Sequence, residues 1–228
     1  MRINKLLSNY GVCSRKEANR IIEEGRVIVN GVLAFPGQWV EEYDDILLDG
    51  VKLTPKERIY IALNKPVGIT CTAASEVSDN VIDYMNYPEY IFPVGRLDKQ
   101  SQGLILMTND GDLANGILEA DNNKEKEYIV TVDKEFDDRF IEGMSSGVDI
   151  GGIITRPCKV TRVNKNTFNI ILTQGLNKQI RKMSKTFGFN VIKLERIRIM
   201  NIKIDGIEYG AWKNLTECEI KELRENTK

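Results

Sequence analysis

The stretch that decides the fold is F-P-V-G-R-L-D-K-Q-S-Q-G at residues 92–103, which the apolar run L-I-L-M at 104–107 follows. It predicts a short buried strand, a polar loop and a second buried strand, because glycines punctuate a charged segment between apolar ones. The loop carries one carboxylate, Asp98, between the cations Arg96 and Lys99. A carboxylate beside a fixed guanidinium stays ionised and keeps one orientation, as a catalytic Asp must. An ordinary loop ion pair has the same pattern, so both interpretations stay open here.

The composition is that of a globular protein without a low-complexity tract. The 228 residues are 42% hydrophobic and 29% charged, which suits one large domain or a small and a medium one. No apolar run approaches the ~20 residues of a membrane span, and the first residues indicate folded sequence, not a secretory signal. The four cysteines are scattered, so we expect reduced thiols, no metal site and a cytoplasmic protein.

The sequence contains no histidine. This excludes Ser-His and Cys-His nucleophiles, histidine bases and most catalytic metal sites. Motifs for a P-loop or a dinucleotide are also missing from the sequence, so we expect no cofactor. Catalysis by this chain would therefore depend on carboxylate, Tyr, Lys or Arg side chains.

The net charge of −1 hides two basic segments. Residues 1–30 hold six Lys or Arg against three Glu, and residues 173–203 hold eight against Glu195 alone. Basic patches on a nearly neutral chain suit an RNA-binding protein that must also release its product. The candidate RNA contacts are Arg2, Lys5, Arg15, Lys16, Arg20, Arg26, Lys65, Lys178, Lys182, Arg196 and Arg198. For Lys65, capping of a turn is an equally good interpretation.

The N-terminal segment predicts a small module of two helices and a hairpin. Residues 3–9 predict a short helix, and Ser14 with Glu17 fits a capping box that opens a second one. Asn30-Gly31 is a strong signal for a two-residue hairpin turn, and we expect a second turn at Asp49-Gly50 between two apolar segments.

The polar segment 54–58 is the best domain boundary, and it gives domains of residues 1–55 and 59–228. Alternation of Tyr128 with two valines predicts a half-buried strand on which Tyr128 faces inward. Alternation of basic and apolar residues over 191–200 predicts a strand with one core face and one cationic face. We expect further helices near 81–85, 112–119, 136–144 and after Thr216, and strands near 147–163 and 167–173.

Several segments resemble RNA pseudouridine synthases of the RsuA/RluB/RluE/RluF type. The catalytic loop of that family is similar to G-R-L-D at 95–98 with S-Q-G-L at 101–104 and T-N-D-G at 108–111. Further segments resemble its N-K-P-x-G turn (64–68), its K-x-Y-x-V motif (126–130), its Q-[IV]-R motif (179–181) and an αL-type RNA-binding domain (6–18 and 25–31). Together they cover almost the whole chain.

The resemblance implies an α+β fold and an activity. We expect a small N-terminal αL-type RNA-binding domain and a mixed, largely antiparallel catalytic domain that isomerises uridine to pseudouridine in RNA. The RluF-like group is nearest, which favours 23S rRNA of the large subunit, with a tRNA hairpin as the alternative. A non-catalytic RNA-binding or ribosome-assembly factor and a nucleoside glycosidase are the rival classes. We expect a monomer.

The resemblance also implies roles for individual residues. Asp98 is the essential carboxylate, Arg181 its ion-pair partner, Tyr128 the ring against the uracil, and Arg96 a support of the loop. Asp98 as nucleophile, as electrostatic stabiliser and as base for a sugar proton stay open. Lys178 stands where many relatives have histidine, while Arg181 keeps the position to which the family assigns the ionic role.

Overall fold

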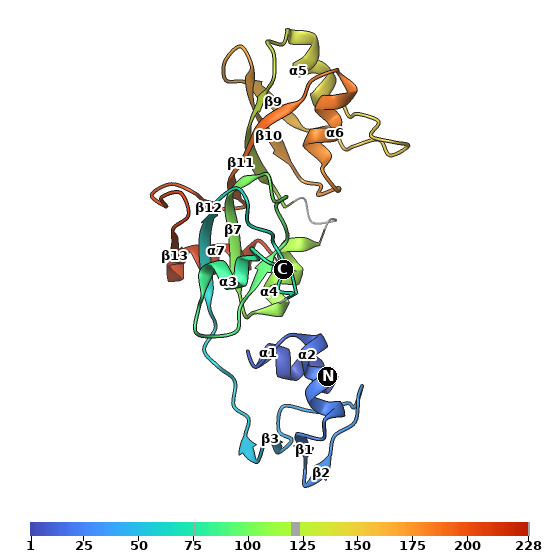
Figure 1. The fold of residues 1–228 in the computed structure, drawn as a ribbon, viewed down its shortest axis with the longest axis vertical. Helices are drawn as coiled ribbons and strands as arrows, with labels where there is room; N and C mark the ends of the chain where they lie inside the picture. Colours follow the sequence, from blue (N-terminus) through green and yellow to red (C-terminus); the bar gives the residue numbers. More distant parts are fainter. Residues whose placement is uncertain (75, 120–123, 228) are drawn as a thin grey trace.

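Two separate β-sheets organise the chain, one on each side of the linker at residues 53–59 (Figure 1). The computed structural model describes residues 1–74, 76–119 and 124–227. Within this part of the chain, no helix is long and apolar enough to cross a membrane.

The N-terminal part packs two helices on a four-stranded sheet of order β2-β1-β3-β4. Asn30, Gly31, Asp49 and Gly50 all have positive φ, so the predicted hairpin turn and the predicted second turn both form. The Ser14 hydroxyl accepts from the Glu17 amide at 3.1 Å, which is one half of the predicted capping box, while the Glu17 side chain accepts from Arg20. The elements are α1 (Ile3–Asn9), α2 (Arg15–Glu23), β1 (Val27–Val29), β2 (Val32–Leu33), β3 (Ile46–Leu48) and β4 (Val51–Lys52).

The second part is built on a nine-stranded sheet of order β13-β5-β7-β11-β8-β10-β9, with β6 paired to β7 and β12 to β11. Among the described residues, β7 and β11 form the one parallel pair of strands, so the sheet is largely antiparallel, as expected. The strands are β5 (Tyr60–Lys65), β6 (Phe92–Val94), β7 (Gln102–Thr108), β8 (Lys126–Val132), β9 (Lys159–Arg162), β10 (Thr167–Leu172), β11 (Val191–Ile199), β12 (Ile202–Lys203) and β13 (Trp212–Asn214).

Strand β7 is buried on both faces, which explains its continuous apolar run. Leu104 and Leu106 pack in one cluster with α4 and α7, while Ile105 and Met107 pack in another with α3. On the other half of the sheet, α5 and α6 cover β8 and β10. The helices are α3 (Val81–Met85), α4 (Gly111–Leu118), α5 (Asp138–Ser145), α6 (Gln179–Thr186) and α7 (Glu217–Glu225).

The predicted element boundaries differ from the structure mainly after α5. A strand was expected from residue 147, but β9 begins at Lys159, and the segment before it forms only an isolated bridge between Asp149 and Ile154. Gly151 and Gly152 have positive φ, and they turn this segment back on itself before a strand can extend.

A polar joint connects the two parts. The Asn109 side chain donates to the carbonyl of Glu57 at 2.8 Å and accepts from the amide of Ile59 at 2.9 Å, which holds the linker on the end of β7. Lys5 of α1 pairs with Asp112 of α4 at 3.0 Å. The T-N-D-G segment therefore supports the joint, and its Asp110 also caps α4.

Gly103 allows β7 and β11 to approach closely at their short parallel contact. A Cβ on Gly103 would lie 2.3 Å from the carbonyl oxygen of Arg196 and 2.6 Å from its amide nitrogen, and φ is +108°. The glycine of the S-Q-G-L segment is thus required by backbone packing.

We predict that Gly103→Ala lowers the free energy of unfolding by about 2–4 kcal/mol, because a Cβ would overlap backbone atoms and strain a positive φ. Gly175→Ala is the matched control, since Gly175 has open space around its Cβ position and no positive φ. Urea denaturation of both variants measures the difference, and equal losses of stability would contradict the packing argument.

Candidate active site

The candidate site lies on the nine-stranded sheet, at the boundary between the apolar cluster under α3 and the apolar cluster under α5 and α6. Tyr128 of β8 packs against the apolar cluster under α5 and α6 and also against the cluster under α3. Leu97, beside Asp98, is buried in the α3 cluster, while Ile180, beside Arg181, is buried in the other. The loop that carries Asp98 and the helix that carries Arg181 are therefore anchored in the two clusters on either side of Tyr128. We call the boundary between these two clusters the seam.

Asp98 and Arg181 form the ion pair that was expected between them. The Nε of Arg181 lies 3.7 Å from Oδ2 of Asp98, and the side chains are 20% and 36% exposed respectively. Asp98 is thus held by a cation and still open to solvent on one side. A partly exposed pair at this distance contributes little to stability, so its value is in orienting the carboxylate.

Backbone and hydroxyl oxygens fix the guanidinium of Arg181. Its Nη1 donates to the carbonyl of Val191 at 3.0 Å, and its Nη2 donates to the hydroxyl of Ser101 at 3.1 Å and the carbonyl of Gln100 at 3.3 Å. Ser101 is 1% exposed. These bonds tie α6, β11 and the Asp98 loop together around one side chain.

A row of four residues crosses the sheet beneath this ion pair. Lys65 on β5 stands opposite Gly103 on β7, Gly103 opposite Arg196 on β11, and Arg196 opposite Tyr128 on β8. Directly opposed residues of an antiparallel pair share a face, so Arg196 and Tyr128 project to the same side of the sheet.

Lys65 is a turn residue in the structure, and its predicted contact with RNA is wrong. The side chain is fully buried, and its ammonium donates to the carbonyls of Pro66 at 2.7 Å and Ile69 at 2.9 Å. Burial lowers the pKa of Lys65, and the nearby Arg196 lowers it further.

The predicted cationic face of β11 is also wrong. Arg196 is 2% exposed, with its Nε bonded to the carbonyl of Leu104 at 2.7 Å. Arg198 is bound by two carboxylates, Glu127 at 2.6 Å and Glu125 at 2.8 Å. A bulge between Arg196 and Arg198 breaks the two-residue alternation, so the arginines do not line one exposed face.

The N-terminal cations divide into paired and unpaired groups. Lys5 belongs to the joint, Arg20 bonds to Glu17, and Arg26 makes a bidentate contact with Asp49 at 2.6 and 2.9 Å. Lys5, Arg20 and Arg26 each form an ion pair with a carboxylate, so they are poor candidates for direct contacts with RNA phosphates. Among the described cations of residues 1–55, those that are exposed and have no carboxylate within 4 Å are Arg2, Arg15 and Lys16.

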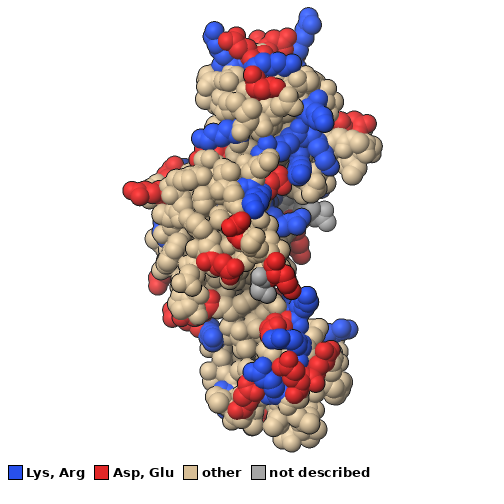
Figure 2. All heavy atoms as spheres, in the orientation of Figure 1, with Lys and Arg blue, Asp and Glu red and all other residues tan. Residues whose placement is uncertain are grey.

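On α6 the predicted cations are exposed. Lys178 precedes the helix in a left-handed conformation with φ 52°, and Lys182 lies one turn further on. Figure 2 shows Lys and Arg side chains gathered over the region that α6 occupies in Figure 1. Arg96, on the Asp98 loop, is exposed as well.

Two glutamine side chains, to which no separate role was assigned from the sequence, hold the loop before α6. Gln179 is 4% exposed and accepts from the amide of Leu176 at 3.0 Å, while Gln174 accepts from the amide of Arg156 at 3.1 Å. The glutamine of the Q-I-R motif was the sequence signal that could have indicated this role for Gln179. Ser101 links the two residues of the ion pair, because its hydroxyl accepts from Arg181 and its amide donates to the carbonyl of Asp98 at 2.9 Å.

Lys126 is a second perturbed cation near the row. It precedes Tyr128 by two residues on β8, and burial lowers its pKa to about 8, with a further contribution from Arg196. No group of three or more Cys, Asp or Glu side chains among the described residues could hold a metal ion.

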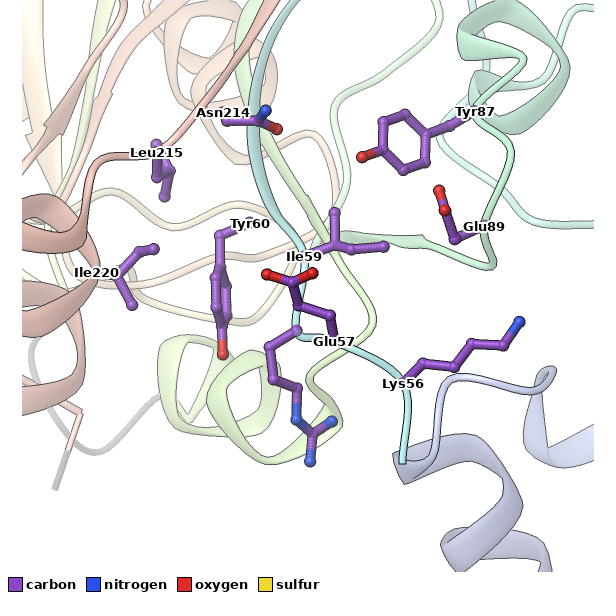
Figure 3. Close-up of a pocket in the computed structure, with 10 residues that line it drawn as sticks. Lys56, Glu57, Ile59, Tyr60, Tyr87, Glu89, Asn214, Leu215 and Ile220 are labelled. Carbon is purple, nitrogen blue, oxygen red and sulfur yellow. The ribbon is translucent and has the colours of Figure 1, made fainter. Parts of the chain in front are cut away.

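A hollow of about 630 Å³ lies away from this site, at the linker. Figure 3 shows Tyr60, Tyr87 and Glu89 around it, with Lys56 and Glu57 of the linker on one side. None of Asp98, Tyr128 and Arg181 lines it, so the hollow belongs to the joint and not to the candidate site.

Comparisons with known proteins agree with this architecture. A family model described as RNA pseudouridylate synthase matches residues 59–186, and one described as S4 domain matches residues 1–46. The dual-specificity RNA pseudouridine synthases RluF of Salmonella typhi and Escherichia coli K12 are 50% identical to this chain, over 97% and 98% of its length and 78% of theirs.

Two further matches are more distant. The ribosomal large subunit pseudouridine synthase B of Bacillus subtilis is 33% identical over 98% of this chain and 95% of its own. A crystal structure described as that of a pseudouridylate synthase superposes with a TM-score of 0.72 at 27% identity, covering 98% of this chain and 99% of the other.

Proposed function

Because this chain belongs to the RNA pseudouridine synthase family, we propose that Asp98, Arg181 and Tyr128 form the site at which it isomerises a uridine of ribosomal RNA. The observation that carries this proposal is the ion pair of Asp98 and Arg181 at the seam that Tyr128 occupies. It supplies an oriented, accessible carboxylate beside an aromatic ring.

The reaction exchanges one bond of the nucleoside for another. The bond from C1′ to N1 breaks with its electron pair leaving on uracil, the ring turns, and C1′ bonds to C5. The hydrogen on C5 then leaves as a proton while N1 regains one, so atoms and charge balance. Neither oxidation nor reduction takes place.

Asp98 faces the positive character that develops at C1′ when this bond breaks. A carboxylate there serves as nucleophile or as electrostatic stabiliser, as in glycosidases, or as base for a sugar proton. Arg181 keeps the carboxylate oriented, Tyr128 packs against the uracil, and exposed Arg96 supports the loop beside the opening.

We propose that RNA runs between two sets of exposed cations. Residues 1–55 form the recognition module with Arg2, Arg15 and Lys16, and residues 59–228 form the catalytic domain with Lys178 and Lys182. Phosphate contacts at both ends would offset the few kcal/mol needed to flip the target uridine out of its stack.

The proposed target is rRNA of the large ribosomal subunit. A relative at 33% identity is named for that subunit, and the relatives at 50% identity are named dual-specificity enzymes. A tRNA hairpin is the alternative target, and the mapping experiment below distinguishes the two.

We predict that Asp98→Asn binds RNA with an affinity within about threefold of wild type but lowers conversion by at least about 10³-fold, because the amide cannot balance charge at C1′. Release of the hydrogen label from uridine marked at C5 measures conversion, and filter binding measures affinity. Asp79→Asn is the control, since Asp79 is exposed and its ion-pair partner is the exposed Lys99. Near-normal turnover by Asp98→Asn would refute the assignment.

We predict that replacing Lys178 and Lys182 together by Gln weakens RNA binding and flattens its salt dependence. The slope of log K against log salt concentration should fall by roughly 0.7–0.9 for each lost phosphate contact. Lys165→Gln is the control, because Lys165 is exposed but pairs with Glu135 on another turn. An unchanged slope in the double variant would show that Lys178 and Lys182 do not contact RNA phosphates.

We predict that deleting the gene removes a pseudouridine from large-subunit rRNA. Mapping pseudouridines in rRNA and tRNA from cells with and without the gene tests this, and the wild-type gene but not the Asp98→Asn gene should restore the modification. If the deletion removes a pseudouridine only from tRNA, the target is tRNA and not rRNA. If the purified protein releases free uracil and forms no pseudouridine, it is a glycosidase.

A further inference from the structure

Arg196 is a buried cation whose bonding is incomplete. Its side chain is 2% exposed, its Nε donates to the carbonyl of Leu104, and its Nη2 is buried without a hydrogen-bond partner. Among the described residues, no carboxylate lies within 4 Å of it. A buried charge without a counter-ion is costly, so a packing role alone explains it poorly.

Arg196 also lies in the row beneath the candidate site. Tyr128 is directly opposite it across the antiparallel pair, where Cβ atoms are about 4.5–5.5 Å apart. On its other side Gly103 carries no side chain, and β7 contacts the guanidinium through the Leu104 carbonyl, which binds Nε and leaves Nη2 without a partner. The positive charge of Arg196 acts on neighbouring groups, since it lowers the pKa of both Lys65 and Lys126.

We propose that Arg196 is a further substrate-binding residue, whose free Nη2 donates a hydrogen bond to a carbonyl oxygen of the target uracil. This inference rests on the proposed site and adds a partner for the base. When the C1′–N1 bond breaks, its electron pair spreads over N1 and the carbonyl oxygens of uracil. The guanidinium stabilises that negative charge without giving up a proton, while Asp98 balances C1′.

The depth of Arg196 favours the base over a phosphate as its partner. A phosphate carries a full charge that stays hydrated at the surface, where Lys178 and Lys182 are exposed. The uracil, by contrast, packs against Tyr128, and Arg196 is the cross-strand neighbour of that ring. Donors aimed at developing charge in a dry site are the strongest form of electrostatic catalysis.

The test exchanges oxygen for sulfur in the substrate and combines this with variants of Arg196. RNAs carry uridine, 2-thiouridine or 4-thiouridine at the target position, and single-turnover rates are measured with wild type, Arg196→Lys and Arg196→Gln. Sulfur is a poorer acceptor, so one thio-RNA should react about tenfold more slowly with wild type. In the Arg196 variants the uridine rate should fall about 10- to 100-fold, and the sulfur effect should shrink below about twofold.

The controls separate this contact from a structural role. Arg198→Lys changes a paired arginine of the same strand and should keep the wild-type ratio of oxygen to sulfur rates. A sulfur effect of the same size in wild type and in Arg196 variants overturns the proposal, and so does a loss of RNA affinity with an unchanged single-turnover rate. If the variants do not fold, equal rates of wild type on all three RNAs still overturn it. Conversion of the uridine RNA by wild type tests the proposed function separately.

Discussion

The contact between β7 and β11 at Gly103 and Arg196 is the constraint on which the rest of the structure depends. It joins the half-sheet that packs on α3 to the half-sheet that packs on α5 and α6. Both sides of the site begin there, because Ser101 precedes Gly103 by two residues and Tyr128 stands in register with Arg196. Backbone packing therefore sets the distance between Asp98 and Arg181, and their exposed ion pair refines it.

Apart from the ion pair of Arg181 with Asp98 itself, carbonyl oxygens are the main acceptors for the buried and half-buried cations around Asp98. Lys65 bonds to the carbonyls of two residues of its turn, Arg181 to those of Gln100 and Val191, and Arg196 to that of Leu104. A carbonyl dipole stabilises a cation without cancelling its charge. Among the described residues, Asp98 is the carboxylate in the surroundings of these three cations, an arrangement that suits a reaction separating a sugar cation from a base anion.

Much of the fold followed from the sequence, because local patterns determine it. The glycine turns, the helix at residues 81–85 and the doubly buried strand β7 were all predicted from turn chemistry and apolar runs. The proximity of Asp98 and Arg181 came only from the family resemblance, since about eighty residues of chain separate them. The burial of Arg196 escaped prediction because a bulge interrupts the alternation on β11. For Lys65 the sequence left turn capping and RNA contact equally open, because its partners are backbone carbonyls that no side-chain pattern reveals.

Strand β7 also connects the site to the joint. Its first residue, Gln102, adjoins the Asp98 loop, and its last, Thr108, adjoins Asn109, which holds the linker to the N-terminal module. A strand of this length is about 20 Å long and changes little with thermal motion. In the proposed function it would act as a spacer of fixed length between the target nucleotide and the point where the linker joins the N-terminal module. An RNA would then be selected partly by how far its target uridine stands from the phosphates that the module holds.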